Sequence, residues 1–157
     1  MTVSFRPYRP TDAEACLDVF DSNVPRYFAT LERPAFAAFL AEMPCAYLVG
    51  EAPDVGVVAC GGWFPAPERG EGVAGLAWGM VRRDWHGRGV GRQLLEARLA
   101  GVRAMPGVHA LEISTSQRTE AFYARAGFSV VERAADGHAP GIDRVEMRWQ
   151  LGATAGA

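Results

Sequence analysis

Residues 80–95, MVRRDWHGRGVGRQLL, run from an apolar strand through a glycine-rich turn into an amphipathic helix. Gly87, Gly89 and Gly91 alternate at the junction. The first N–H groups of a helix have no internal partner, and the helix dipole is positive there. Glycines let a ligand approach the backbone closely, so the junction predicts an anion site. Because Arg88 and Arg92 add positive charge, a pyrophosphate is the expected ligand.

Two other phosphate-binding patterns compete for this loop. The dinucleotide fingerprint G-x-G-x-x-G requires glycine where Arg92 stands, and its loop normally follows the first strand of the fold. Glu112 lies roughly twenty residues further on, where a ribose-binding acid is expected, but it lies inside a strand. The Walker A pattern needs Gly-Lys-Ser/Thr, which the sequence lacks. A glycine turn that only tightens the strand–helix junction stays open.

The rest of the chain predicts a series of strands and helices around this loop. Apolar, β-branched and aromatic runs predict strands at 3–8, 46–50, 55–64, 73–81, 108–114, 128–133 and 144–151. Helical spacing predicts four helices: after a capping box over 11–14, after Pro34, over 90–105 and over 117–126. Residues 134–142 are expected to form a loop between the last two strands.

This order predicts an α/β (α+β) fold. The three adjacent strands in the middle are best antiparallel, and the later β-α-β crossover requires one parallel pair. We expect a single domain with a central mixed, mostly antiparallel sheet of about seven strands, flanked by about four helices, and not a doubly wound fold. The domain is expected to span residues 1–151, and residues 152–157 to form a flexible C-terminal tail.

Composition excludes several classes of function. The chain has 157 residues, 49% apolar residues and a net charge of −2, which suits one globular domain without a basic face for nucleic acid. The N-terminus has no apolar signal segment, and no apolar run is long enough to span a membrane, so we expect a cytoplasmic protein. Cys16, Cys45 and Cys60 have no metal-type spacing, and no metal is expected.

With these residues in view, the chain resembles the GCN5-related N-acetyltransferase (GNAT) superfamily. That family's central motif, Arg/Gln-x-x-Gly-x-Gly/Ala, follows a strand ending in Val and opens a helix; residues 81–95 match it. A second motif, Tyr-x-x-x-Gly-Phe, is matched by Tyr123 to Phe128. One departure stands in the first motif, where His86 occupies a place usually held by Arg or Gln.

The resemblance implies that acetyl-CoA is the cosubstrate. Its pantetheine arm would lie between the fourth and fifth strands, which splay apart in this family, and its pyrophosphate would bind the amides of the glycine loop. The residues implied in cofactor binding are Gly79, Met80, Val81, Gly87, Arg88, Gly89, Val90, Gly91, Arg92, Ser116 and Gln117. Ser116 and Gln117 stand where the family often places Asn.

The resemblance also implies two catalytic residues. Direct acyl transfer requires an amine to lose a proton and the departing thiolate to gain one. Tyr123 matches the family's general acid for the thiolate. Glu112 is the candidate general base, because related enzymes sometimes carry a glutamate on this strand; a solvent-facing glutamate and a water chain to backbone carbonyls are its alternatives.

The expected function is therefore an acetyl-CoA-dependent N-acetyltransferase that transfers an acetyl group directly to a primary amine of a small molecule or peptide. A non-catalytic acyl-CoA-binding sensor is the alternative, and a nucleotide- or NAD-binding domain is a third. We expect no nucleic-acid or membrane partner. The sequence does not determine the acceptor amine, the acyl preference beyond acetyl or the oligomeric state, so a homodimer stays open.

Overall fold

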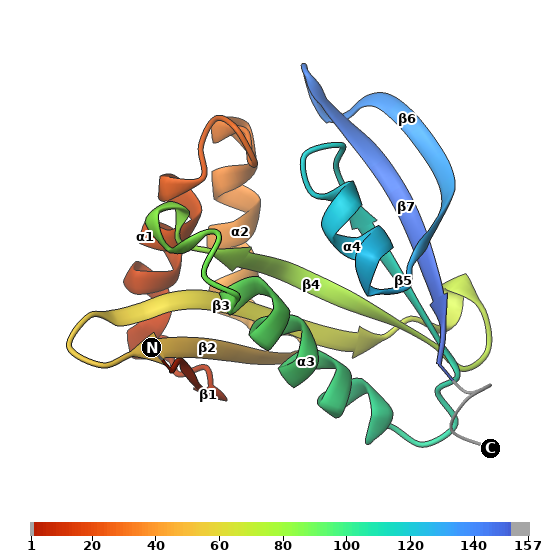
Figure 1. Ribbon diagram of the computed structural model, residues 1–157, viewed down its shortest axis with the longest axis horizontal. Coiled ribbons are helices and arrows are strands. Elements are labelled where there is room, and N and C mark those ends of the chain that lie inside the picture. The colour runs from red at the N-terminus through yellow and green to blue at the C-terminus, as the bar shows by residue number, and fades with distance from the viewer. Residues whose placement is uncertain (1, 152–157) are drawn as a thin grey trace.

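The computed structural model describes residues 2–151, and the expectations for Met1 and for a tail over residues 152–157 lie outside this range. Figure 1 shows one sheet with helices on both faces. The elements are β1 (Ser4–Pro7), α1 (Ala13–Ser22), α2 (Arg33–Glu42), β2 (Ala46–Ala52), β3 (Gly56–Pro65), β4 (Val73–Val81), α3 (Val90–Arg103), β5 (Ala110–Thr115), α4 (Glu120–Ala126), β6 (Ser129–Ala139) and β7 (Ile142–Gln150).

The seven strands form one sheet in the order β1-β2-β3-β4-β5-β7-β6. β4 and β5 are parallel and are joined through α3, because a parallel pair needs a crossover connection. The other neighbouring strands are antiparallel. The predicted fold class, a mixed and mostly antiparallel sheet flanked by four α-helices, is confirmed.

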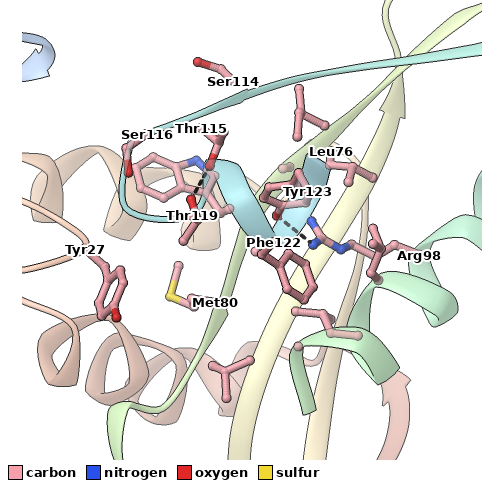
Figure 2. Close-up of a pocket in the computed structure, with 18 of the residues that line it drawn as sticks. Tyr27, Leu76, Met80, Arg98, Ser114, Thr115, Ser116, Thr119, Phe122 and Tyr123 are labelled. Carbon is pink, nitrogen blue, oxygen red and sulfur yellow. Dashed lines mark hydrogen bonds between the residues drawn. The ribbon is translucent and has the colours of Figure 1, made fainter. Parts of the chain in front are cut away.

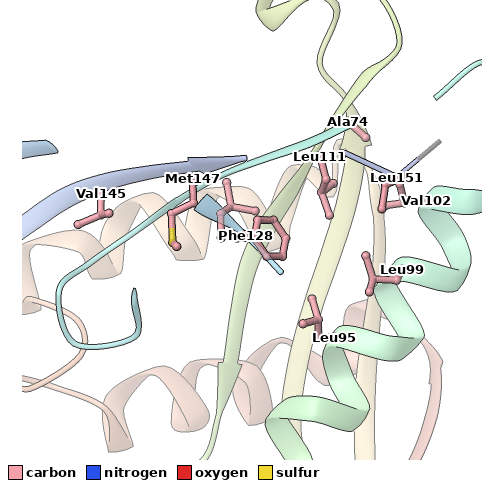
Figure 3. Close-up of a cluster of buried hydrophobic side chains, with 10 residues drawn as sticks. Ala74, Leu95, Leu99, Val102, Leu111, Phe128, Val145, Met147 and Leu151 are labelled. Carbon is pink, nitrogen blue, oxygen red and sulfur yellow. The ribbon is translucent and has the colours of Figure 1, made fainter. Parts of the chain in front are cut away.

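Each face of the sheet has its own apolar core. On one face, α1 and α2 pack against β2, β3 and β4 through residues such as Phe20 and Phe36. On the other face, Leu95 and Leu99 of α3 meet Leu111 of β5 and Phe128 (Figure 3). None of the helices within residues 2–151 is long and apolar enough to cross a membrane.

The expected loop over residues 134–142 was wrong. β6 continues to Ala139 and turns directly into β7. Polar side chains hold this hairpin: Asp136 accepts the N–H of Gly141 at 2.7 Å, and Asp143 accepts the N–H of Asp136 at 2.9 Å. Such hydrogen bonds from side chains let a polar, glycine-containing segment form an irregular strand pair. The composition of the segment is typical of a loop and does not predict this pairing.

The start of α1 also differs from its prediction. The sequence predicts a capping box formed by Thr11 and Glu14. In the structure the Asp12 carboxylate instead accepts the N–H of Arg9 at 2.8 Å. Asp12 also pairs with Arg6 at 2.8 Å, and this bond holds the pKa of the Asp12 carboxyl below its ordinary value, although burial opposes the shift. The helix start is therefore fixed to β1 by an ion pair that no local pattern predicts.

Candidate active site

The central feature is a cleft where β4 and β5 separate. Their parallel pairing covers only Val73 to Gly75 of β4 against Ala110 to Glu112 of β5. Beyond this point the strands diverge, and a cleft of about 1630 Å³ extends between them to α3 and α4. Pockets for a single small ligand usually measure roughly 300–1,000 Å³, so this cleft has room for a cosubstrate arm and a second substrate.

A β-bulge in β4 forms part of the cleft wall. Cys60 pairs with Met80 and Gly62 with Ala77, so two residues, Trp78 and Gly79, face Gly61. Trp78 has φ of +37°, which is rare for a bulky residue. The Tyr47 hydroxyl donates a 2.7 Å hydrogen bond to the Trp78 carbonyl, and burial raises the pKa of Tyr47, which keeps it a donor. The bulge is thus a supported feature of the site.

Backbone groups of β4 differ in the direction they face. The Arg82 N–H donates to the Val58 carbonyl at 2.7 Å, so alternation along the strand directs the polar groups of Met80 to β3 and those of Val81 to the cleft. Gly79, Met80 and Val81 all line the cleft, and Met80 does so with a side chain that Figure 2 shows inside it. Of the predicted backbone contacts, only the Val81 N–H is therefore directed toward an extended arm, because the Val81 carbonyl oxygen already contacts side chains of Asn23 and His86. Met80 contributes its side chain instead.

The glycine loop closes one end of the cleft. Gly87 and Gly89 have φ of +78° and +81°, and Gly89 is the N-cap of α3. A Cβ at either position would meet open space, so backbone conformation rather than crowding requires glycine there. Gly87, Gly89, Gly91 and Arg92 line the cleft, where the first N–H groups of α3 have no partner within the helix, an arrangement that favours an anion. Val90 turns inward and is buried beside Trp85.

The basic side chains near the loop have different roles. The Arg88 guanidinium stacks over the Trp85 ring at 4.6 Å, and Arg82 pairs with Asp84 at 2.7 Å. Arg92 lines the cleft, and no carboxylate within residues 2–151 forms an ion pair with it. Arg92 is thus the loop arginine best placed for a ligand phosphate.

His86, the departure from the family motif, contacts the end of β4. Its Nε2 atom lies 2.8 Å from the Val81 carbonyl oxygen. The buried Asn23 side chain donates to the same oxygen at 2.9 Å and to the Val19 carbonyl of α1 at 2.9 Å. These two side chains fix the strand-to-loop turn, and His86 also lines the cleft beside the glycine loop.

Tyr123 enters the cleft from α4. Its ring packs edge-on against Phe122 and Phe128, at centroid distances of 5.1 and 5.5 Å. Its hydroxyl accepts a long hydrogen bond of 3.5 Å from Nη2 of Arg98 on α3, and Figure 2 shows both groups facing each other. The aromatic packing fixes the ring while the hydroxyl stays at the cleft surface.

The two residues expected at the start of the second motif lie apart. Ser116 is buried and lines the cleft, and its hydroxyl accepts the Arg118 N–H at 3.2 Å. Gln117 points away: its amide donates to the Gly141 carbonyl at 2.9 Å and accepts the Asp143 N–H at 2.8 Å. α4 begins at Glu120 rather than Gln117. Gln117 therefore fastens the β6–β7 turn, and only Ser116 reaches the cleft.

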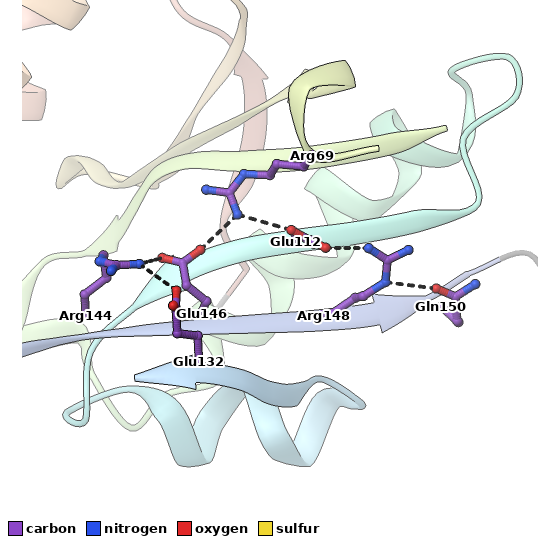
Figure 4. A network of polar contacts seen from close by, with 7 residues as sticks. All are labelled: Arg69, Glu112, Glu132, Arg144, Glu146, Arg148 and Gln150. Carbon is purple, nitrogen blue, oxygen red and sulfur yellow. Dashed lines mark hydrogen bonds and ion pairs between the residues drawn. The ribbon is translucent and has the colours of Figure 1, made fainter. Parts of the chain in front are cut away.

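The structure does not bring Glu112 to the cleft. Leu111 and Ile113 face the core with α3, so Glu112 points to the opposite face of the sheet. There its carboxylate pairs with Arg69 at 3.3 Å and with Arg148 (Figure 4). Arg69 also pairs with Glu146 at 2.9 Å. This position explains Glu112 as part of an ion-pair network and gives no support to its expected role as a general base.

Sequence reasoning missed Arg98. It interrupts the apolar stripe of α3 formed by Leu94, Leu95, Leu99 and Val102. A charged residue within an apolar stripe is the sequence feature that could have identified Arg98 as a site residue. Arg98 is only 2% exposed and lines the cleft. No group of three or more potential metal-ligating side chains gathers within residues 2–151.

The fold and the cleft define a class of protein: a mixed-sheet domain that opens between two parallel strands, with an anion site at the start of the crossover helix. A family model described as an acetyltransferase (GNAT) domain matches residues 44–130. The match covers more than half of the chain and includes both sequence motifs. The chain belongs to the GNAT acetyltransferase family.

Solved structures share the whole fold. A GNAT-family protein from Desulfovibrio desulfuricans is 26% identical, with a TM-score of 0.76 over 95% of this chain and 99% of its own. A phosphinothricin acetyltransferase from Sinorhizobium meliloti, in complex with acetyl-CoA, is 16% identical, with a TM-score of 0.76 over 96% and 89%. A Salmonella typhimurium protein solved with its cofactor acetyl-CoA is 17% identical, with a TM-score of 0.72 over 96% and 95%. Curated proteins give no significant match.

Proposed function

We propose that this protein is an acetyl-CoA-dependent N-acetyltransferase that acts on a primary amine of a small molecule or peptide. The observation that carries the proposal is that the anion site at the start of α3 and the Tyr123 hydroxyl lie at the same cleft. The pyrophosphate would bind at Gly87 to Arg92, and the arm would run along Gly79 to Val81 toward Tyr123. Ser116 lies across the cleft from β4 and would border the arm.

In the proposed reaction, the amine nitrogen attacks the thioester carbonyl carbon. A C–N bond forms, the C–S bond breaks, and the amine loses one proton. The departing thiolate takes a proton from the Tyr123 hydroxyl, which stands on a ring held by Phe122 and Phe128. Positioning of both substrates in one cleft supplies much of the rate enhancement, because it replaces a bimolecular encounter.

We propose that the amine proton leaves to bulk solvent through water molecules that backbone carbonyls of the cleft hold by hydrogen bonds, rather than to Glu112, and that the Tyr123 phenolate regains its proton from solvent. Two carboxylates line the cleft, Glu32 and Glu96. The Glu32 carboxylate accepts the Ala29 N–H at 2.8 Å, and Glu96 is on the exposed side of α3. Neither is a dedicated base, whereas the carbonyls along the separated part of β4 and β5 can accept hydrogen bonds from water.

The test is incubation of the protein with acetyl-CoA and a broad panel of amines, monitored by release of free thiol and by mass of the amine product. Calorimetry with CoA forms a second arm. Thiol release coupled to an acetylated amine supports the proposal. Tight CoA binding without turnover on any amine would favour the sensor alternative, and absence of CoA binding would remove both.

A further inference from the structure

Arg98 is a buried cation that forms no ion pair with any carboxylate among the residues that the structure describes. It is 2% exposed, and its Nε atom has no hydrogen-bond partner. Within residues 2–151 its side chain makes one hydrogen bond, the 3.5 Å contact from Nη2 to the Tyr123 hydroxyl, which is at the long limit for such a bond. A guanidinium has five N–H donors, and Arg98 lines the cleft, so further donors are available to a ligand there.

The surrounding backbone makes room for this side chain. A Cβ at Gly79 would lie 2.5 to 2.7 Å from Nη1, Nη2 and Cζ of Arg98, and a Cβ at Gly61 would lie 3.2 Å from its Cδ. Both glycines face each other at the bulge of β3 and β4. The guanidinium therefore lies against the bulge, on the α3 face of the sheet, beside Tyr123 (Figure 2).

A buried charge of this kind is costly unless it is paired. Burial of an ion without a counter-ion destabilises a fold, and an apolar residue of similar size would stabilise it more. The apolar stripe of α3 would accept leucine or methionine at this position. Since the fold gains nothing from the unpaired charge, an anion that arrives with a ligand accounts for it.

The anion cannot be the pyrophosphate, because that group is expected at the start of α3. Arg98 lies about two and a half helical turns further along α3 than the N-cap Gly89, a rise of roughly 13.5 Å at 1.5 Å per residue. It lies instead at the Tyr123 hydroxyl, where the thioester is expected to react. An anion at Arg98 must therefore belong to the transferred acyl group or to the acceptor beside it.

We propose that Arg98 recognises a carboxylate carried by one of the two substrates, next to the reacting thioester. This inference rests on the proposed transferase function and deepens it by naming the substrate class. A planar guanidinium pairs with a carboxylate through two parallel hydrogen bonds, which suits recognition better than a lysine would. The carboxylate is either the far end of a dicarboxylic acyl chain or the carboxylate of an amino-acid acceptor.

Two experimental arms with matched substrates separate these sources. Propionyl-CoA is compared with malonyl-CoA and butyryl-CoA with succinyl-CoA for the acyl chain, and α-amino acids are compared with their amides for the acceptor. The readout is kcat/KM for thiol release by wild-type protein. We expect at least about tenfold preference for the carboxylate-bearing member in one of the two arms. Equal rates in both arms would overturn the proposal without any variant.

Variants then assign the preference to Arg98. Arg98→Met removes the charge and keeps the length, and should reduce the preference to about threefold or less, because kcat/KM falls more for carboxylate-bearing substrates than for neutral ones. Arg98→Lys should retain part of the preference for carboxylate-bearing substrates. Arg103→Met is the matched control, because Arg103 is exposed on the same helix, over the Trp149 ring at 5.9 Å, and outside the cleft.

Stability gives a readout that is independent of turnover. Without ligand, Arg98→Met should melt at a temperature equal to or higher than the wild type, because an unpaired buried charge is removed. A large fall in melting temperature, or an equal loss of kcat/KM for charged and neutral substrates, would show that Arg98 serves the fold or the common chemistry, and would overturn the proposal. Absence of thiol release with every substrate would instead count against the transferase function itself.

Discussion

The two faces of the β4–β5–β7 region use arginine in opposite ways. On the face away from α3 and α4, Arg69, Arg144 and Arg148 each pair with a glutamate, as Figure 4 shows. On the cleft face, Arg98 is more deeply buried, and no carboxylate in the described part of the chain, residues 2–151, pairs with it. The first arrangement satisfies its charges within the chain, and the second leaves a charge for a ligand.

The same contrast separates the two residues expected to be catalytic. Glu112 belongs to the paired network, and Tyr123 faces the unpaired Arg98 at the cleft. Perturbing the network should therefore change stability and leave chemistry intact, and perturbing the cleft should do the reverse.

Gly89→Asp should lower CoA affinity by about 100-fold or more, which corresponds to roughly 2.8 kcal/mol. The substitution places a negative charge and a side chain at φ of +81°, at the start of α3 where phosphate is expected. Calorimetric titration with CoA measures the effect.

Gly107→Asp is the matched control for Gly89→Asp. Gly107 has a similar φ of +75° in a turn outside the cleft, so it carries the same backbone strain without the same charge at the anion site. CoA affinity should stay within about threefold of wild type. An equal loss in both variants would mean that general destabilisation, not the loop, explains the result.

Tyr123→Phe should lower turnover by roughly 100-fold, the lower range for loss of a positioned acid, and should leave CoA affinity nearly unchanged. The phenyl ring keeps its packing against Phe122 and Phe128, so only the hydroxyl is lost. Thiol-release kinetics and calorimetry measure the two effects. Tyr8→Phe, in which the lost hydroxyl contacts the Leu40 carbonyl away from the cleft, should retain turnover. Full activity in Tyr123→Phe would require another acid.

Glu146→Gln should reduce the free energy of unfolding by about 2 kcal/mol at neutral pH, the scale of hydrogen bonds to a charged group. Burial favours a higher pKa for Glu146, but hydrogen bonds from Arg69, Ser114 and Arg144 outweigh it and lower the pKa below the ordinary 4.5. A lowered pKa contributes stability above pH 4.5, and this contribution is lost as the pH falls through the folded-state pKa.

Denaturant unfolding at several pH values tests this account of Glu146. The difference between wild type and Glu146→Gln should shrink as the pH falls below 4.5. Glu132→Gln is the control, because the Glu132 side chain is 65% exposed and its 3.4 Å pair with Arg144 should contribute little. A pH-independent difference would contradict the ion-pair explanation.

Glu112→Gln should have the smallest effect, a loss of about 1 kcal/mol in stability with turnover within about twofold of wild type. Its carboxylate pairs with Arg69 and Arg148 outside the cleft. The measurement is thiol release at saturating acetyl-CoA across a range of acceptor concentrations. A fall of roughly 100-fold in turnover would restore Glu112 as the general base and break the division between the two faces.

Several features of this protein were determined by local sequence. Glycines at positive φ before a helix predict the anion site, because only the backbone conformation and the free N–H groups of the first turn are needed. Val73–Val81 was predicted to the residue, and the motif from Tyr123 to Phe128 places the phenol at the end of a helix. Connection lengths and the single crossover were enough to predict the mixed sheet.

Other features were decided only by tertiary structure, because they depend on contacts between residues far apart in the chain. The alternation of side chains along β5 predicts that Glu112 points away from the core. It does not predict that Arg69 and Arg148 form ion pairs with Glu112 on that face. The Gln117 side chain lies away from the cleft because its amide donates a hydrogen bond to the Gly141 carbonyl of the β6–β7 turn. Arg98 becomes an unpaired charge at the cleft only because Gly61 and Gly79 make room for it and Tyr123 lies opposite.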